Sequence, residues 1–246
     1  PFWDMGQIEN TIRSDSISVS EFQWTRDVMS CVPGNGQLGL MLSGPEDFHG
    51  YCFGVADCRD DIPLYGMTKG YFIRFSPGTF SALFKIPSAE IPARGIDLSL
   101  VLPREKVEQI KDAVASQFPG ETLLRMFEGW NVDSCHSQKE QELANEAVHL
   151  IWSNRGALRI KDLEQETLYS ARRLQEVVTR QVGIGPKQLC RQTRFQNALK
   201  LLTSPRAGVY TQAEAAQILG YSDQSHYTRE FKEFSGVCPC QFQKQI

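Results

Sequence analysis

The stretch from Gln212 to Phe242 constrains the fold more than any other part of this sequence. Small and apolar residues at helical spacing lead to Gly220, and glycine readily ends a helix because it tolerates the left-handed conformation. Asp223 then suits the N-cap of a second helix. In that helix the apolar residues recur every three or four positions and predict a buried face. They are Tyr227, Phe231 and Phe234.

The other face of this second helix is polar. Its outward side chains are Gln224, Ser225, His226 and Arg229. The apolar face of the preceding helix is assigned to Ala213, Ala216, Ile218 and Leu219. Two short helices, a glycine turn and an exposed row of hydrogen-bonding side chains predict a helix-turn-helix unit. The second helix of such a unit enters the major groove of DNA.

A second copy of this pattern lies upstream, at residues 158–183. Ser170 is its candidate N-cap, and the turn must come from residues 167–169 without a glycine. The buried stripe of its second helix is Leu174, Val177 and Val178. The side chains facing away are Arg172, Gln175, Glu176 and Thr179. Between the two copies, residues 187–203 predict one connecting helix with an apolar face of Leu189, Phe195, Leu199 and Leu202.

These residues resemble the AraC/XylS-type DNA-binding domain. The first half of that domain is matched by Leu163, Ser170, Leu174, Gly183, Pro186, Arg194, Ala198 and Leu199. The second half is matched by Ala216, Gly220, Tyr221, Tyr227, Arg229, Phe231, Gly236, Pro239 and Phe242. The sequence departs from the family at Val178, where phenylalanine is frequent, and at Glu176, where a basic residue is common. Glutamate there can accept a hydrogen bond from cytosine but repels phosphate.

The resemblance implies a bacterial transcription regulator that binds double-stranded promoter or operator DNA. It further implies a homodimer, contact with RNA polymerase and a small-molecule effector. The eight outward side chains of the two second helices are the expected DNA contacts. We assign the DNA-binding domain to residues 148–246 and a linker to residues 131–147.

The distribution of charge agrees with this division. Residues 147–246 hold 14 Lys and Arg against 8 Asp and Glu, a net charge of +6. Residues 1–146 hold 12 Lys and Arg against 21 Asp and Glu, a net charge of −9. The charges of the two parts sum to −3 for the whole chain. Because DNA is a polyanion, we expect it to meet the carboxyl-terminal domain.

Cysteine usage and hydropathy indicate the compartment. The 7 cysteines are odd in number and spread along the chain, which predicts free thiols in a reducing cytosol. No apolar run approaches the ~18 residues of a membrane span. The sequence starts Pro-Phe-Trp-Asp, without a signal segment and without an initiator Met, so we expect a trimmed amino terminus. The predicted location is cytoplasmic, with no membrane partner.

Residues 1–130 predict a β-rich domain. Short segments with alternating apolar residues are interrupted by turns, a pattern typical of a small barrel or sandwich. Its strands are expected around Ile17 to Trp24, Leu38 to Leu42, Tyr51 to Val55 and Tyr71 to Phe75. Helices are expected at 79–84, from Pro103 to Phe118 and at 121–130. Residues 70–91 also resemble a cupin-like domain that precedes AraC-type domains in bacterial regulators. The predicted fold class is therefore α+β, with a small β-barrel or cupin-like domain followed by an all-α double helix-turn-helix domain.

Two other functions compete with DNA-binding regulation. The first is a β-domain enzyme or small-molecule-binding protein in which DNA binding is secondary. A metal-dependent cupin site needs two or three histidines with a carboxylate, and His49 is the one histidine in residues 1–130. A zinc site from Cys31, Cys52, Cys58 and Cys135 would lack a CxxC pair. We therefore predict no catalytic residue, no metal and no cofactor. In the second alternative the β-rich domain only dimerises.

Overall fold

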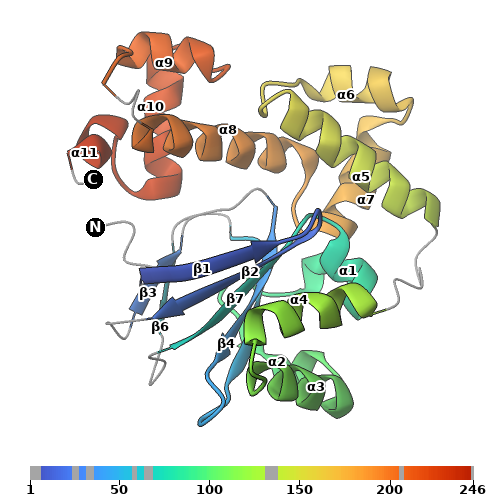
Figure 1. Ribbon diagram of the computed structural model, residues 1–246. Coiled ribbons are helices and arrows are strands. Elements are labelled where there is room, and N and C mark those ends of the chain that lie inside the picture. The colour runs from blue at the N-terminus through green and yellow to red at the C-terminus, as the bar shows by residue number, and fades with distance from the viewer. Residues whose placement is uncertain are drawn as a thin grey trace.

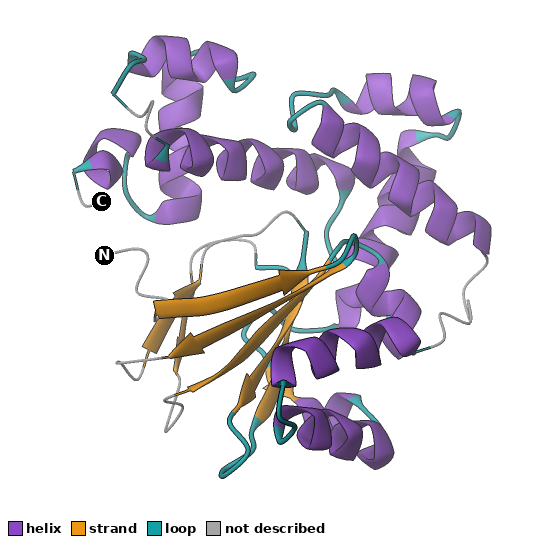
Figure 2. Cartoon of the chain, in the orientation of Figure 1, coloured by secondary structure: helices purple, strands orange, loops and turns teal. Residues whose placement is uncertain are grey.

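The computed structural model describes residues 7–23, 28–31, 36–56, 60–63, 69–130, 138–204 and 208–244. Within them, a sheet-containing amino-terminal half is followed by a helical carboxyl-terminal half (Figure 1; Figure 2). This confirms the predicted α+β order of a β-rich half and an all-α half. Several sequence predictions lie outside the described residues: Trp24, the turn at 32–35, Cys58, Cys135 and the start of the linker.

The described strands of the first half are antiparallel. They are β1 (Gln7–Arg13), β2 (Ile17–Gln23), β3 (Val28–Cys31), β4 (Leu38–Ser43), β5 (Gly50–Phe53), β6 (Asp60–Pro63), β7 (Lys69–Phe75) and β8 (Ile96–Asp97). One sheet has the order β1-β2-β7-β4-β5-β8, and β3 pairs with β6. Val19 and Leu40 both lie opposite Ile73, so these three buried residues form a row across the sheet. Since β1 and β8 are edges, the strands described form an open sheet rather than the closed barrel that we considered.

Helices α1 (Thr79–Phe84), α2 (Leu98–Val101), α3 (Arg104–Val114) and α4 (Pro119–Gly129), with the 3-10 turn η1 (Ser88–Glu90), complete this half. The aromatic rings of Phe75, Phe84 and Phe127 join the sheet to α1 and α4, with centroids 5.4–6.1 Å apart. The predicted helices are confirmed, with one correction. The helix expected from Pro103 to Phe118 ends at Val114, and Phe118 beyond it is 62% exposed.

The second half consists of helices in the described residues. They are α5 (Gln138–Ser153), α6 (Ile160–Thr167), α7 (Ala171–Val182), α8 (Pro186–Thr203), α9 (Gln212–Ile218), α10 (Gln224–Ser235) and α11 (Pro239–Gln243). Helix α8 runs between a group formed by α5, α6 and α7 and a group formed by α9, α10 and α11 (Figure 1). Helix α5 begins inside the range that we assigned to the linker, and residues 138–147 are helical. None of the helices in the described ranges combines the length and apolar character needed to cross a membrane.

The two halves are in direct contact at the end of α7. The hydroxyl groups of Ser81 and Ser88 donate to the backbone oxygen of Gln181, at 3.2 and 2.7 Å. From α8, the side-chain nitrogen of Gln192 donates to the backbone oxygen of Ala56 at 2.7 Å. Among the described residues, the side-chain nitrogen of buried Gln181 has no hydrogen-bond partner.

Candidate nucleic-acid interface

Helices α9 and α10 form the downstream helix-turn-helix. Gly220 between them has φ +77, in the left-handed region, as the glycine stop predicted. The carboxylate of Asp223 accepts a hydrogen bond from the backbone nitrogen of His226 at 2.8 Å, which confirms the N-cap. The apolar face of α9 needs correction. Ala216 and Leu219 are buried as predicted, but Ala215 takes the third place because Ala213 and Ile218 are exposed.

The buried stripe of α10 is confirmed. Tyr227, Phe231 and Phe234 are fully buried. The rings of Phe231 and Phe234 pack against Phe195 of α8, with centroids 5.2 and 5.1 Å from its own. This packing fixes the rotation of α10 on α8. As a result Gln224, Ser225 and Arg229 are exposed on its other side. Arg229 has no ion pair among the described residues.

His226 is placed differently from the other three outward residues of α10. Its side chain is 37% exposed, and its Nδ1 lies 3.1 Å from the hydroxyl of Ser222. Its Nε2 lies 3.8 Å from a carboxylate oxygen of Glu230. Both ring nitrogens therefore face protein groups. A base contact by His226 stays a prediction, and it requires the ring to turn away from Glu230.

Helices α6 and α7 form the upstream helix-turn-helix. In place of a glycine, Leu168 takes the left-handed conformation with φ 61, so the turn lies within 167–169 as predicted. The hydroxyl of Ser170 accepts from the backbone nitrogen of Arg173 at 3.3 Å, which confirms this N-cap. Leu174, Val177 and Val178 are buried as predicted.

The predicted DNA contacts on α7 are paired with one another. Arg172, Gln175 and Glu176 are exposed and Thr179 is half-buried. The Nε of Arg172 lies 3.2 Å from Glu176 Oε1, and Gln175 Nε2 donates to Thr179 Oγ1 at 3.0 Å. Exposed i,i+4 pairs are worth only ~0.3–0.5 kcal/mol, so they can exchange for contacts with bases.

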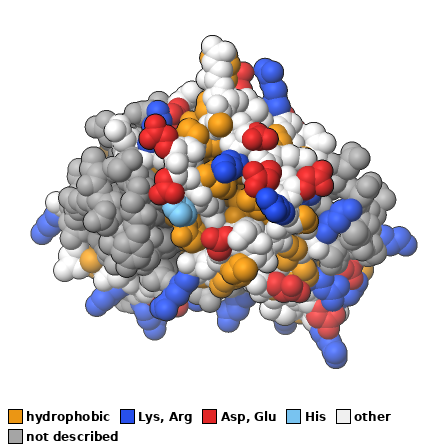
Figure 3. Space-filling model, turned by 90° about the horizontal axis from the view of Figure 1, so that it is seen from below, with side chains coloured by type: hydrophobic (Ala, Val, Ile, Leu, Met, Phe, Trp, Pro, Cys, Tyr) orange, Lys and Arg blue, Asp and Glu red, His pale blue; other side chains and the backbone are white. Residues whose placement is uncertain are grey.

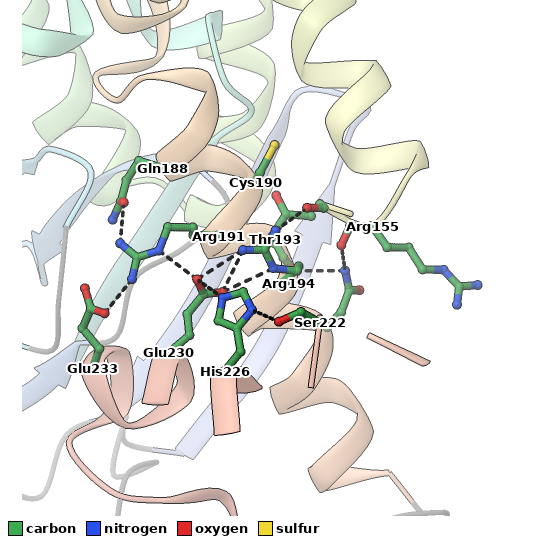
Figure 4. A network of polar contacts seen from close by, with 12 residues as sticks. Arg155, Gln188, Cys190, Arg191, Thr193, Arg194, Ser222, His226, Glu230 and Glu233 are labelled. Carbon is green, nitrogen blue, oxygen red and sulfur yellow. Dashed lines mark hydrogen bonds and ion pairs between the residues drawn. The ribbon is translucent and has the colours of Figure 1, made fainter. Parts of the chain in front are cut away.

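A buried carboxylate that the sequence analysis missed joins α10 to α8. Glu230 is 3% exposed, and its Oε2 accepts from Arg191 Nε at 2.8 Å (Figure 4). Its Oε1 lies 3.1 Å from Arg194 Nη2. Arg194 also donates through Nη1 to the backbone oxygen of Gly156, at 2.8 Å, between α5 and α6. Through Arg194 this network reaches both helix-turn-helix units.

Arg191 forms ion pairs with two carboxylates. Its Nη2 lies 2.6 Å from Glu233 Oε2, and its Nε lies 2.8 Å from Glu230 Oε2. Burial alone would lower the pKa of Arg191, but hydrogen bonds to Glu233 and Glu230 outweigh it and raise that pKa above its ordinary value. Arg191 is therefore a structural cation. A signal was present in the sequence: Glu230 stands between Tyr227 and Phe231, beside the apolar stripe.

A second carboxylate fixes α7 to α5. Glu140 Oε1 lies 2.7 Å from Arg173 Nη2, and Glu140 Oε2 lies 2.9 Å from Arg180 Nη1. The Glu140 side chain is 13% exposed, and this burial would raise its pKa. The hydrogen bonds and charges of Arg173 and Arg180 outweigh burial, so the pKa of Glu140 is lowered. The pair of arginines holds the upstream recognition helix at one rotation.

The ion pairs of Glu140 with Arg173 and Arg180 predict that the stability of the fold depends on pH. A carboxyl group with a lowered pKa in the folded state stabilises the fold above its unfolded pKa of ~4.3, and the effect disappears as pH falls through the folded pKa. Glu140→Gln should therefore lower the free energy of unfolding by about 1 kcal/mol at pH 7 and by less at pH 3. Urea unfolding at both pH values measures this. Glu146→Gln, at an exposed position of the same helix, is the matched control, and an equal loss in both variants would contradict the role of Glu140.

The lower face of the sheet-containing half has a mixed surface. Where this face is not grey in Figure 3, acidic and basic side chains are interspersed, with apolar groups between them. DNA-binding surfaces concentrate positive charge. This part of the face therefore lacks the electrostatic character of a DNA interface, in agreement with the net charge of −9 of residues 1–146.

His49 and Cys52 were considered above as possible metal ligands, and the structure shows what surrounds each of them. His49 Nε2 lies 3.2 Å from Asp47, in the loop between β4 and β5. The described part of the chain has no group of three or more His, Cys, Asp or Glu residues arranged to hold a metal. Cys52 is a buried free thiol, and burial raises its pKa to about 12.

Comparison with known proteins agrees with the geometry of the second half. Residues 163–245, about a third of the chain, match the family model described as "Helix-turn-helix domain". The Msm operon regulatory protein of Streptococcus mutans is 26% identical over 103 residues. That alignment spans 42% of this chain and 36% of the relative, so it covers about a third of the relative's length.

Solved structures of ToxT from Vibrio cholerae overlay on nearly the whole chain. A structure of ToxT from Vibrio cholerae O395 aligns with 94% of this chain and 98% of its own, with 11% identity and a TM-score of 0.46. A ToxT structure bound to (E)-4-(8-methylnaphthalen-1-yl)but-3-enoic acid aligns with 94% of this chain and 99% of its own, with 11% identity and a TM-score of 0.48. At these scores the overlay assigns no role to any residue.

Two helix-turn-helix units with confirmed caps and buried stripes, the matched family model and the regulator relative agree on one conclusion. Residues 163–245 of this chain are an AraC-type helix-turn-helix domain.

Proposed function

We propose that this protein is a bacterial transcription regulator of the AraC/XylS type that binds double-stranded DNA at specific sequences. The observation that carries the proposal is the pair of helix-turn-helix units on one connecting helix, each with an exposed polar row on its second helix. Such a pair suits two successive major grooves, ~34 Å apart. The regulator relative supports a role in transcription.

The exposed side chains divide into two classes. Arg229 suits the two acceptors of a guanine, Gln175 suits adenine, and Glu176 suits the amino group of cytosine. Exposed lysines, such as Lys187 of α8 and Lys232 of α10, suit phosphate. The first class is proposed to read sequence, and the second to supply affinity that does not depend on sequence.

The remaining parts of the proposal concern the whole protein. We place it in the cytoplasm with its DNA, as a homodimer that contacts RNA polymerase. The boundaries 1–130, 131–147 and 148–246 are retained as proposed domains, with α5 beginning in the linker range. The sheet-containing half is proposed to sense a small-molecule effector, because it lies against both α5 and the end of α7.

Salt dependence tests the DNA proposal. If the full chain contacts about six phosphates, the logarithm of its DNA affinity should fall with the logarithm of salt at a slope of about −5. Fluorescence anisotropy with labelled DNA selected from a genomic library measures this slope. Lys232→Ala should weaken all sequences equally and flatten the slope by about one. Lys111→Ala, an exposed lysine on α3, is the matched control. A slope near zero, or equal effects of the two variants, would contradict the proposed interface.

A further inference from the structure

The carboxyl end of α7 lies against α1 and η1 of the sheet-containing half (Figure 1). The last carbonyl groups of a helix have no partner within the helix, so they need hydrogen-bond donors from elsewhere. Helix α7 ends at Val182, and the backbone oxygen of Gln181 accepts from the hydroxyls of Ser81 and Ser88. The sheet-containing half therefore supplies donors to the end of the upstream recognition helix.

Ser81 and Ser88 are held as a pair. Their hydroxyl oxygens lie 2.8 Å apart, and Ser81 Oγ also accepts from the backbone nitrogen of Ser88 at 3.1 Å. Ser81, Ser88 and Gln181 are all buried, at 3%, 1% and 1% exposure. A buried carbonyl without a donor costs free energy, so the two hydroxyls stabilise the contact between the halves.

The chain packs closely around these hydrogen bonds. A Cβ on Gly36 would lie 2.8 Å from Val182 Cγ1 and 2.8 Å from Leu189 Cδ1. A Cβ on Gly183 would lie 3.3 Å from the backbone oxygen of Ser88. Distances this short leave no room for α7 to move toward the sheet-containing half. Because the serine hydroxyls oppose movement away from it, the end of α7 is fixed in both directions.

The same helix end is joined to the row of expected base contacts. Thr179 belongs to that row, and its backbone oxygen accepts from the backbone nitrogen of Gly183 at 2.8 Å. Gln175 also belongs to it, and a Cβ on Gly185 would lie 2.3 Å from Gln175 Nε2. The segment just after α7 thus lies between Ser88 and Gln175. A displacement of this segment would move side chains that are proposed to read bases.

The contact leaves the outward face of α7 open to DNA. Arg172, Gln175 and Glu176 are exposed while the two halves are in contact, so the described residues of the sheet-containing half do not cover them. Such a contact fixes the helix without competing with DNA. Without it, DNA binding must also order the end of the helix, and ordering costs free energy. Removing the contact should therefore weaken DNA binding.

We infer that Ser81 and Ser88 are positioning residues for DNA recognition, which hold the end of α7 so that the upstream unit meets its half of the operator. The downstream unit is fixed separately, because α10 packs on α8 and binds it through Glu230. The role in DNA recognition rests on the proposed function, whereas the effect on the end of α7 does not require DNA. The two can therefore fail separately.

Hydrogen exchange of the full chain without DNA tests the effect on α7. In Ser81→Ala/Ser88→Ala, the amides of the last turn, including that of Gly183, should exchange at least about threefold faster than in the parent chain. Ser43→Ala/Ser116→Ala is the matched control, because both hydroxyls donate to backbone oxygens within the sheet-containing half. The control should leave α7 unchanged. Unchanged exchange in the first variant, or equal acceleration in both, would overturn the inference.

DNA binding tests the effect on recognition. Fluorescence anisotropy compares the selected operator with two versions in which one half-site at a time is scrambled. The downstream half-site is identified as the one whose scrambling costs Arg229→Ala less affinity than it costs the parent chain.

Ser81→Ala/Ser88→Ala should bind the intact operator about three- to tenfold more weakly than the parent chain, since two hydrogen bonds that hold α7 are lost. Scrambling the upstream half-site should then cost this variant less affinity than it costs the parent chain. Scrambling the downstream half-site should cost both the same. Equal changes at the two half-sites, or tighter binding to the operator, would overturn the inference. If the parent chain binds no DNA, the proposed function is wrong, and hydrogen exchange still decides whether the serines hold α7.

Single substitutions keep the test decisive if the double variant does not fold. Each leaves one hydroxyl near the Gln181 oxygen, so Ser81→Ala and Ser88→Ala should each change exchange and binding less than the double variant. Ser88→Ala should have the larger effect, because its bond of 2.7 Å is shorter than the 3.2 Å bond of Ser81. Thermal melts show which variants are folded. If folded Ser88→Ala exchanges at the end of α7 as slowly as the parent chain, the inference is wrong.

Discussion

Glu230→Ala is expected to lower the free energy of unfolding of the helical half by about 3 kcal/mol or more. Glu230 is 3% exposed, while the side chains of Arg191 and Arg194 are 23% and 13% exposed. Removing the carboxylate leaves Arg194 without an ion-pair partner among the described residues, and it leaves Arg191 with the exposed Glu233. Breaking a buried pair by removing one partner typically costs ~3–5 kcal/mol, because the remaining charge is uncompensated. Urea unfolding followed by circular dichroism measures the change.

Glu233→Ala is the matched control for this experiment. Glu233 binds the same Arg191, but its side chain is 54% exposed and Arg191 keeps its bond to Glu230. We expect a loss below ~1 kcal/mol, as for other exposed ion pairs. Similar losses of unfolding free energy in the two variants would mean that buried Glu230 does not stabilise the contact between α10 and α8.

The ion pairs of Glu230 also affect how the two helix-turn-helix units are placed for DNA binding. Arg194 connects Glu230 on α10 to the backbone oxygen of Gly156, before α6. Gly156 has φ +76, and a Cβ there would lie 2.3 Å from the backbone oxygen of Cys190, so the chain approaches α8 closely at this point. The relative placement of the two units thus depends on contacts among the loop between α5 and α6, α8 and α10. Two recognition helices reach successive grooves only when that placement is fixed.

The local features of the fold could be predicted from the sequence because they depend on neighbouring residues. Ser170 and Asp223 were predicted as N-caps, and both accept the expected backbone hydrogen bonds. Helical periodicity identified the buried stripe of α10, and a glycine marked the turn before it. In the other half, period-two alternation located the strands that lie in the middle of the sheet.

The contacts that join distant segments could not be predicted in this way. Glu230 meets partners that lie 36 and 39 positions away, and no local pattern specifies such a pair. Glu140 lay in a polar stretch that was assigned to the linker, so its role in holding α7 was missed. The alternation of apolar and polar residues likewise predicts strands, but it does not predict whether the sheet closes into a barrel. The described sheet is open.

Arg229→Ala is expected to weaken binding to the true operator by about 1–3 kcal/mol, or roughly 5- to 150-fold, and to relax discrimination at one base pair. Arg229 is exposed on α10, two residues after buried Tyr227 and two before buried Phe231. That position is about a turn and a half into the helix, where a side chain can reach a base edge. Its guanidinium then suits the two acceptors of a guanine. Anisotropy titrations on operator and on scrambled DNA measure the difference.

A competing hypothesis is that Arg229 pairs with Glu233, four residues on, and only stabilises its own helix. In the structure Glu233 binds Arg191 at 2.6 Å instead, so Arg229 is available for DNA. Arg125→Ala is the matched control, because Arg125 is 80% exposed, forms an i,i+4 pair with Glu121 and lies in the sheet-containing half. The control should change neither titration, and thermal melts should show both variants folded. If Arg229→Ala weakens operator and scrambled DNA equally, Arg229 contacts phosphate and does not read a base, since a phosphate contact is the same on every sequence.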